Sequence, residues 1–105
     1  MPEDRGRAGG ADVFLVALGE AGWRASVAIA RRLRAAGLRV AMPLSVRPMG
    51  AQLKRADRAG ARFALFVGEG EIGIGRYGLK DLATGEQCAV AEEDLVERLG
   101  GRHVE

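Results

Sequence analysis

Cysteine and histidine are almost absent from this sequence, and long apolar runs are missing altogether. Cys88 is the single cysteine and His103 the single histidine. These counts exclude an internal disulfide framework and any Cys/His cluster with metal-ligand spacing. A Ser-His or Cys-His catalytic pair is not expected, because His103 stands alone in the C-terminal tail. Cys88 falls in a predicted strand, where we expect it to be a small buried residue.

No apolar run approaches the roughly 18–20 residues that a helix needs to span a bilayer. Residues 1–13 also lack the apolar stretch of a signal peptide. Together with the single cysteine, these features predict a cytoplasmic protein. At 105 residues the chain is long enough for one domain with one hydrophobic core.

Glycines suggest a dinucleotide-binding motif that the surrounding sequence argues against. Residues 68–73 (GEGEIG) and 73–78 (GIGRYG) both match the spacing G-x-G-x-x-G. That motif works only between a strand and a helix whose N-terminus faces the pyrophosphate. Here the following residues read as another strand, so we interpret the glycines as turn residues and expect no bound dinucleotide.

Basic residues are unevenly distributed along the chain. Between residues 21 and 68 ten basic residues accompany one acid, Asp57, for a net charge of +9. The remaining residues carry six basic and thirteen acidic side chains, for a net charge of −7. This asymmetry predicts a cationic face that attracts a polyanion. The alternative is a set of arginines on ordinary solvated helices, since fourteen of the sixteen basic residues are arginine.

Hydrophobic periodicity and turn residues predict an α/β fold. Residues 1–11 form a charged, glycine-rich tail or linker, residues 12–100 form the domain, and residues 101–105 form a second tail. The predicted order is β-α-β-α-β-β-β-α, a five-stranded mixed sheet with three helices. The strands are expected at 13–18, 38–42, 62–67, 75–82 and 87–90, and the helices at about 21–36, from about 48 to 60, and at 91–99.

Candidate recognition residues lie in the cationic segment and around the glycine-rich loop. Cations suit phosphates, while bases in an unpaired loop need donors and acceptors at their edges. For each residue taken singly, a solvated surface charge is the simpler interpretation. The candidates are Arg47, Gln52, Lys54 and Arg55 in the second loop and helix, and Glu69, Glu71 and Lys80 around the glycine loop and fourth strand.

The sequence resembles the anticodon-binding domain of class II aminoacyl-tRNA synthetases, most closely the C-terminal domain of histidyl-tRNA synthetase. The resemblance covers residues 12–99. It is carried mainly by QLKRADRAGARFALFVGEGE (52–71) and GRYGLKDLATGEQCAV (75–90), with DVFLVALGE (12–20) and the 30–40 passage in support. It implies a five-stranded mixed sheet with three helices that docks on a tRNA anticodon stem-loop.

By this resemblance, Glu71 and Lys80 match an acid and a base that approach anticodon bases. Arg47, Lys54 and Arg55 match the segment that lines the anticodon. The chain departs from the family where Gly50 and Ala51 stand at positions often occupied by lysine. Gly78 also replaces a usual β-branched residue, which should loosen the fourth strand.

The resemblance implies that adenylation and transfer belong to a catalytic domain whose motifs this sequence lacks. ATP and histidine would bind there, so no cofactor or metal is expected in this chain. The implied partner is tRNA, most simply tRNA(His), and the parent synthetase would be a homodimer. The chain is either a piece of such a histidine–tRNA ligase or a stand-alone relative. A protein-interaction or dimerisation module is the alternative function.

Overall fold

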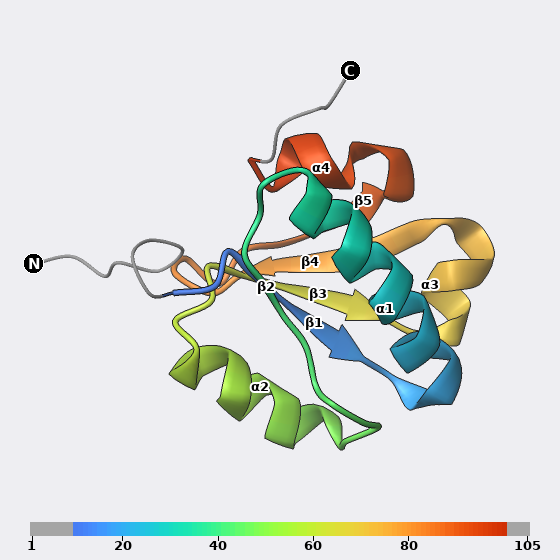
Figure 1. Cartoon of the computed structure of the whole chain (residues 1–105), viewed down its shortest axis with the longest axis horizontal. Coiled ribbons are helices and arrows are strands. Elements are labelled where there is room, and N and C mark those ends of the chain that lie inside the picture. Colours follow the sequence, from blue (N-terminus) through green and yellow to red (C-terminus); the bar gives the residue numbers. More distant parts are fainter. Residues whose placement is uncertain (1–9, 101–105) are drawn as a thin grey trace, which may run out of the picture.

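The fold is one α/β unit built on a five-stranded sheet (Figure 1). A computed structural model describes residues 10–100 of the chain. Residues 1–9 of the predicted tail at 1–11, and the whole predicted tail at 101–105 with His103, lie outside these described residues. The elements are β1 (Val13–Ala17), α1 (Gly19–Ala35), β2 (Val40–Ala41), α2 (Met49–Arg58), β3 (Phe63–Val67), α3 (Glu69–Ile74), β4 (Arg76–Asp81), β5 (Gln87–Ala91), a 3₁₀ turn η1 (Glu92–Asp94) and α4 (Leu95–Arg98).

The sheet has the mixed topology that the sequence predicts. Its strand order is β2-β1-β3-β4-β5, with β1 parallel to both β2 and β3. The last two strands are antiparallel to their neighbours. Each crossover carries a helix, α1 between β1 and β2 and α2 between β2 and β3, as parallel pairing requires.

Helices cover the two faces of the sheet, which explains the apolar run of β1. Val13 and Leu15 pack with α1 and α4 on one face. Phe14 and Val16 pack with α2 on the other face. Successive strand residues point to opposite faces, so a strand covered on both sides is apolar throughout. In the described residues no helix is long and apolar enough to cross a membrane.

A short helix, α3, occupies residues that the sequence assigned to a loop, so the prediction of three helices is wrong in number. The prediction that the glycine-rich loop leads directly into a strand is also wrong, because α3 begins right after Gly68. Six residues with two interior glycines give no readable helical periodicity. Gly75, at φ 69°, then ends the helix in the left-handed conformation. Two acids, Glu69 and Glu71, occupy the first turn, where a dinucleotide fingerprint would leave room for phosphate.

Two further predictions differ from the structure. The last helix, predicted over 91–99, is a 3₁₀ turn followed by a one-turn helix, because Ala91 still pairs with Arg76 in the sheet. The loosening of β4 by Gly78 stays a prediction; the Phe66 ring lies 3.6 Å from the position that a Cβ on Gly78 would occupy. The expectation that Cys88 is buried is wrong. Strand β5 lies at the edge of the sheet, so Cys88 is exposed, with Arg98 Nη2 3.1 Å from its sulfur.

We expect Gly22→Ala to destabilise the protein by about 1–3 kcal/mol. Gly22 is buried where α1 crosses the end of β3, and a Cβ there would collide with the carbonyl oxygen of Val67. Gly50→Ala is the matched control, because nothing lies within 4 Å of its added Cβ on α2. It should stabilise by roughly 0.5–1 kcal/mol through helix propensity. Urea unfolding measures both, and equal effects of the two variants would contradict the packing described.

Candidate nucleic-acid interface

The carboxyl ends of β1 and β3 form the natural ligand-binding edge of this sheet. The chain leaves β1 toward α1 on one face, while α2 packs on the opposite face. Ligands of open α/β sheets bind in the crevice at such a reversal. Leu18 and Gly68 lie side by side at this edge, with Leu18 N donating to Val67 O at 2.8 Å. We call this region the carboxyl edge; the segment 42–48, which leads into α2, reaches it as well.

Gln52 of α2 connects the end of β1 to the segment 42–48 through buried hydrogen bonds. Its side chain is fully buried. Its Oε1 accepts from Ala17 N at 2.8 Å, and its Nε2 donates to Ala17 O at 2.7 Å and to Arg47 O at 2.7 Å. All three bonds are to backbone groups, so the amide has no remaining N–H to offer a ligand. The prediction that Gln52 contacts RNA is therefore not compatible with its position.

The segment 42–48 carries apolar side chains into solvent. Leu44 is 82% exposed and Val46 50% exposed. Trp23 of α1 holds the start of this segment through a 2.9 Å bond from Nε1 to Pro43 O. Exposed apolar groups beside cations offer faces on which unpaired bases can pack. The sequence reasoning missed these two residues, although the stretch PLSVRP contains both.

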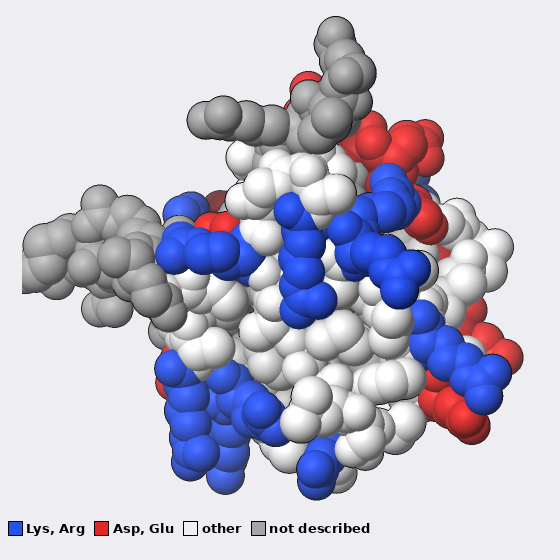
Figure 2. Space-filling model, in the orientation of Figure 1, with Lys and Arg blue, Asp and Glu red and all other residues white. Residues whose placement is uncertain are grey.

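Basic side chains run along the outer face of α2. Arg47, Lys54, Arg55 and Arg58 line a shallow groove of about 300 Å³, and all four are exposed. Figure 2 shows this basic group over α2, with further basic side chains over α1. The segment and helix that the sequence singled out thus form one cationic surface, to which the structure adds Arg58. The α2 groove below means these four residues.

Glu71 of α3 lies at the carboxyl edge, next to Gly68. Its Oε1 is 2.7 Å from the position that a Cβ on residue 68 would occupy, so the carboxylate lies directly against Gly68. The side chain is half-buried, whereas Glu69 is exposed. A half-buried carboxylate is an acceptor able to bind the amino group of a base.

The structure does not bring Lys80 and Glu71 together. Lys80 pairs with Ala64, four residues before Gly68 on β3. Four residues of strand separate the two sites by about 13 Å. Continued two residues past the Phe66–Gly78 pair, the same register leads to Gly68 and Arg76, so Arg76 is the basic residue of β4 on the side of the carboxyl edge. Sequence reasoning missed Arg76, because the register of β3 against β4 is not readable without a short turn between them.

Two polar networks are located away from the α2 groove. Arg32 and Tyr77 both bind Glu92, at 2.8 Å each, and connect α1, β4 and η1. Burial, with the hydrogen bond to Glu92, raises the pKa of Tyr77 to about 12. The phenol therefore keeps the proton that it donates to Glu92 well into alkaline solution.

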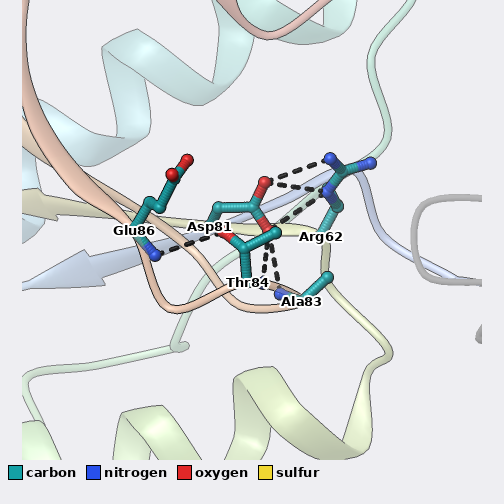
Figure 3. A network of polar contacts seen from close by, with 5 residues as sticks. All are labelled: Arg62, Asp81, Ala83, Thr84 and Glu86. Atoms are coloured by element: carbon teal, nitrogen blue, oxygen red, sulfur yellow. Dashed lines mark hydrogen bonds and ion pairs between the residues drawn. The ribbon is translucent and has the colours of Figure 1, made fainter.

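The second network closes the β4–β5 hairpin at the opposite end of the sheet from Gly68 (Figure 3). Arg62 binds the Asp81 carboxylate through Nε and Nη2, at 3.0–3.2 Å. The same carboxylate accepts from Ala83 N at 2.8 Å and Thr84 N at 3.2 Å. These contacts lower the pKa of Asp81, with the hydrogen bond from Arg62 as the largest cause. In the part of the chain described, no group of three or more His, Cys, Asp or Glu residues could hold a metal ion.

Comparison with known proteins agrees with this architecture. The family model for the anticodon binding domain matches residues 12–102. The chain therefore belongs to the anticodon-binding domain family. It is similar to the histidine–tRNA ligase of Rhodococcus jostii (strain RHA1), with 44% identity over 89 residues, covering 85% of this chain and 21% of the relative. The corresponding ligase of Saccharopolyspora erythraea is 47% identical over 85 residues, covering 81% and 20%.

Solved structures give the same result. The apo histidyl-tRNA synthetase of S. aureus superposes with a TM-score of 0.82 at 30% identity, covering 87% of this chain and 23% of that one. The histidyl-tRNA synthetase of Nostoc sp. PCC 7120 gives a TM-score of 0.79 at 35% identity, covering 85% and 21%. The chain spans about a fifth of the length of the relatives it matches.

We expect Asp81→Asn to lower the free energy of unfolding by about 0.2–1 kcal/mol at neutral pH. Asparagine keeps an oxygen for the turn amides and loses only the charge that Arg62 binds. Because the folded pKa of Asp81 is lowered, its stabilisation is present above the unfolded pKa of about 3.9 and is lost as pH falls through the folded value. The difference between variant and wild type should therefore shrink below about pH 4.

Glu20→Gln is the control for this prediction, since the Glu20–Arg24 pair is about three-quarters exposed on both sides and should contribute little. Chemical unfolding at a series of pH values measures both variants. A deficit of Asp81→Asn that stays constant down to strongly acidic pH would contradict the ion pair as its origin.

Proposed function

We propose that this domain binds the anticodon stem-loop of a tRNA at its carboxyl edge and along the α2 groove. The observation that carries the proposal is the meeting of two surfaces at one edge of the sheet. An exposed cationic helix begins at this edge, and the half-buried carboxylate of Glu71 lies at the same edge, against Gly68. The cationic helix can bind a phosphate backbone, and the carboxylate can bind the edge of a base. Membership of the anticodon-binding domain family supports this assignment.

The surface suggests a division of work among its residues. Lys54, Arg55 and Arg58 neutralise phosphates along the stem side, and Arg47 does so at the edge. Leu44 and Val46 offer apolar contact to unstacked bases. Glu71 accepts a hydrogen bond from a base amino group or ring N–H. Lys80 lies farther along β4 and contacts a phosphate, or a base other than the one that Glu71 binds. Glu69 lies at the exposed margin of this surface.

The similarity to histidine–tRNA ligases extends the proposal to a parent reaction. In a chain of that type this domain positions tRNA(His) for aminoacylation in protein biosynthesis. ATP and histidine bind a catalytic domain outside these 105 residues, and the parent ligase acts as a homodimer. This domain itself supplies RNA contacts and no reacting group.

A protein-interaction module is the second candidate, and one observation favours it. Ile74, at the end of α3, is 72% exposed, apart from the cationic surface of α2. Exposed apolar residues of this kind are used in protein interfaces. Binding to a protein and not to a stem-loop RNA would select this alternative.

We expect affinity for stem-loop RNA to fall steeply with salt. Each neutralised phosphate adds about 0.7–0.9 to the slope of log affinity against log salt concentration. Arg55→Ala should lower that slope by about one contact and weaken cognate and scrambled loops alike. Fluorescence anisotropy over a salt series measures both quantities. A slope near zero would remove the electrostatic part of the proposal.

Glu71→Ala separates base reading from charge attraction. If Glu71 accepts a hydrogen bond from a base, the variant should lose about 1–3 kcal/mol of preference for the cognate over a scrambled anticodon. If the surface attracts RNA by charge alone, the variant should instead bind the cognate RNA more tightly, because removing a negative charge strengthens binding to every RNA. The comparison uses Arg55→Ala as its control. Equal tightening of both RNAs by Glu71→Ala would show that Glu71 does not read a base.

A further inference from the structure

Strand β2 stops before it has paired with the whole of β1. Val13 pairs with Val40 and Phe14 with Ala41, after which β2 ends. Continued in the same register, β2 would place Leu44 opposite Ala17. The chain has left the sheet by then, and the Leu44 side chain is instead 82% exposed. The N–H and C=O of Ala17 on this side are therefore without a strand partner, although Ala17 is fully buried.

Gln52 replaces the missing strand residue. Its side-chain amide accepts from Ala17 N and donates to Ala17 O, so that an amide side chain pairs with the backbone as a strand would. Unsatisfied buried backbone groups are costly, and water cannot reach this site. The Gln52 amide thus allows β2 to end early and the segment 42–48 to enter solvent.

The same amide also holds the end of that segment. Its second Nε2 hydrogen is donated to Arg47 O at 2.7 Å, while Gln52 N donates to Pro48 O at 3.2 Å. The N-cap residue of α2, Pro48, offers no side-chain hydrogen bond to the first turn. The backbone of Arg47 is therefore fixed by a residue one turn farther along the helix, and the guanidinium it carries remains exposed.

We propose that Gln52 is a positioning residue for RNA binding: it holds the Arg47 backbone to the end of β1 and so presents the Arg47 side chain at the carboxyl edge. Gln52 touches no RNA. This inference rests on the proposed function. Glutamine is suited to the role because one amide supplies one acceptor and two donors at the reach required. Methionine keeps the length but supplies no donor, and asparagine is one methylene shorter.

A double-mutant cycle tests this role, with a stem-loop RNA carrying the histidine anticodon as the probe. Arg47→Ala should weaken binding by roughly ten-fold, as for one charge-assisted contact. Gln52→Met should weaken binding by a similar factor, although it changes no charge. The double variant should bind no worse than either single variant, because Gln52 acts through Arg47.

Ile29→Val is the stability control. Ile29 lies in the core on the α1 face of the sheet, away from the α2 groove, and this variant should bind RNA like the wild type. Gln52→Asn repeats the cycle with a smaller perturbation in case Gln52→Met does not fold. Losses that multiply to about a hundred-fold in the double variant would overturn the inference. So would wild-type affinity in Gln52→Met, or an equal loss in Ile29→Val.

Amide hydrogen exchange gives a measurement that needs no RNA. In Gln52→Met or Gln52→Asn the Ala17 amide should exchange faster, while Leu18, whose amide donates to Val67 O, stays protected. Unchanged protection of Ala17 would overturn the inference. If the wild type binds no stem-loop RNA, the proposed function fails and takes this role with it. If the wild type binds the RNA and the Gln52 variants bind it equally well, while Arg47→Ala binds it more weakly, the proposed function stands and the positioning role alone fails.

Discussion

The pairing of the Gln52 amide with the backbone of Ala17 is the contact on which the interface depends. It closes the hydrogen bonding of β1 where β2 has ended, from within a fully buried position. Without it, either β2 would continue and carry residues 42–48 into the sheet, or two buried backbone groups would be left unsatisfied. The same amide anchors Arg47 O. The Gln52 side chain thus completes the hydrogen bonding of the sheet and also fixes the backbone of the adjacent surface segment.

The charge asymmetry of the sequence becomes a spatial division in the fold. Basic side chains gather over α1 and α2, and acidic ones toward α3 and η1 (Figure 2). The carboxyl edge includes both the start of the basic helix α2 and the Glu71 carboxylate of α3. A polyanion attracted by the basic surface meets the Glu71 carboxylate at this edge, which couples attraction by charge to recognition of a base.

The sequence was sufficient for the strands and the topology, because long apolar runs and crossover helices obey strong rules. The resemblance to the anticodon-binding domain family was likewise confirmed. The short helix α3 and the exposure of Cys88 were not predictable from periodicity, since one is six residues long and the other depends on which strand lies at the edge. Gln52 looked like a surface contact because glutamine is usually exposed. Its burial follows from the early end of β2, a tertiary feature. The separation of Lys80 from Glu71 likewise depends on the β3–β4 register.

The central claim is that RNA binds at the carboxyl edge and along α2. Backbone amide chemical shifts, followed while a stem-loop RNA carrying the histidine anticodon is added to the 105-residue chain, test it most directly. Binding at this surface predicts the largest changes at residues 18–20, 43–55 and 68–71, with the β4–β5 hairpin turn at 81–86 almost unaffected. Changes concentrated at the hairpin turn or at α4, with the carboxyl edge unaffected, would contradict it.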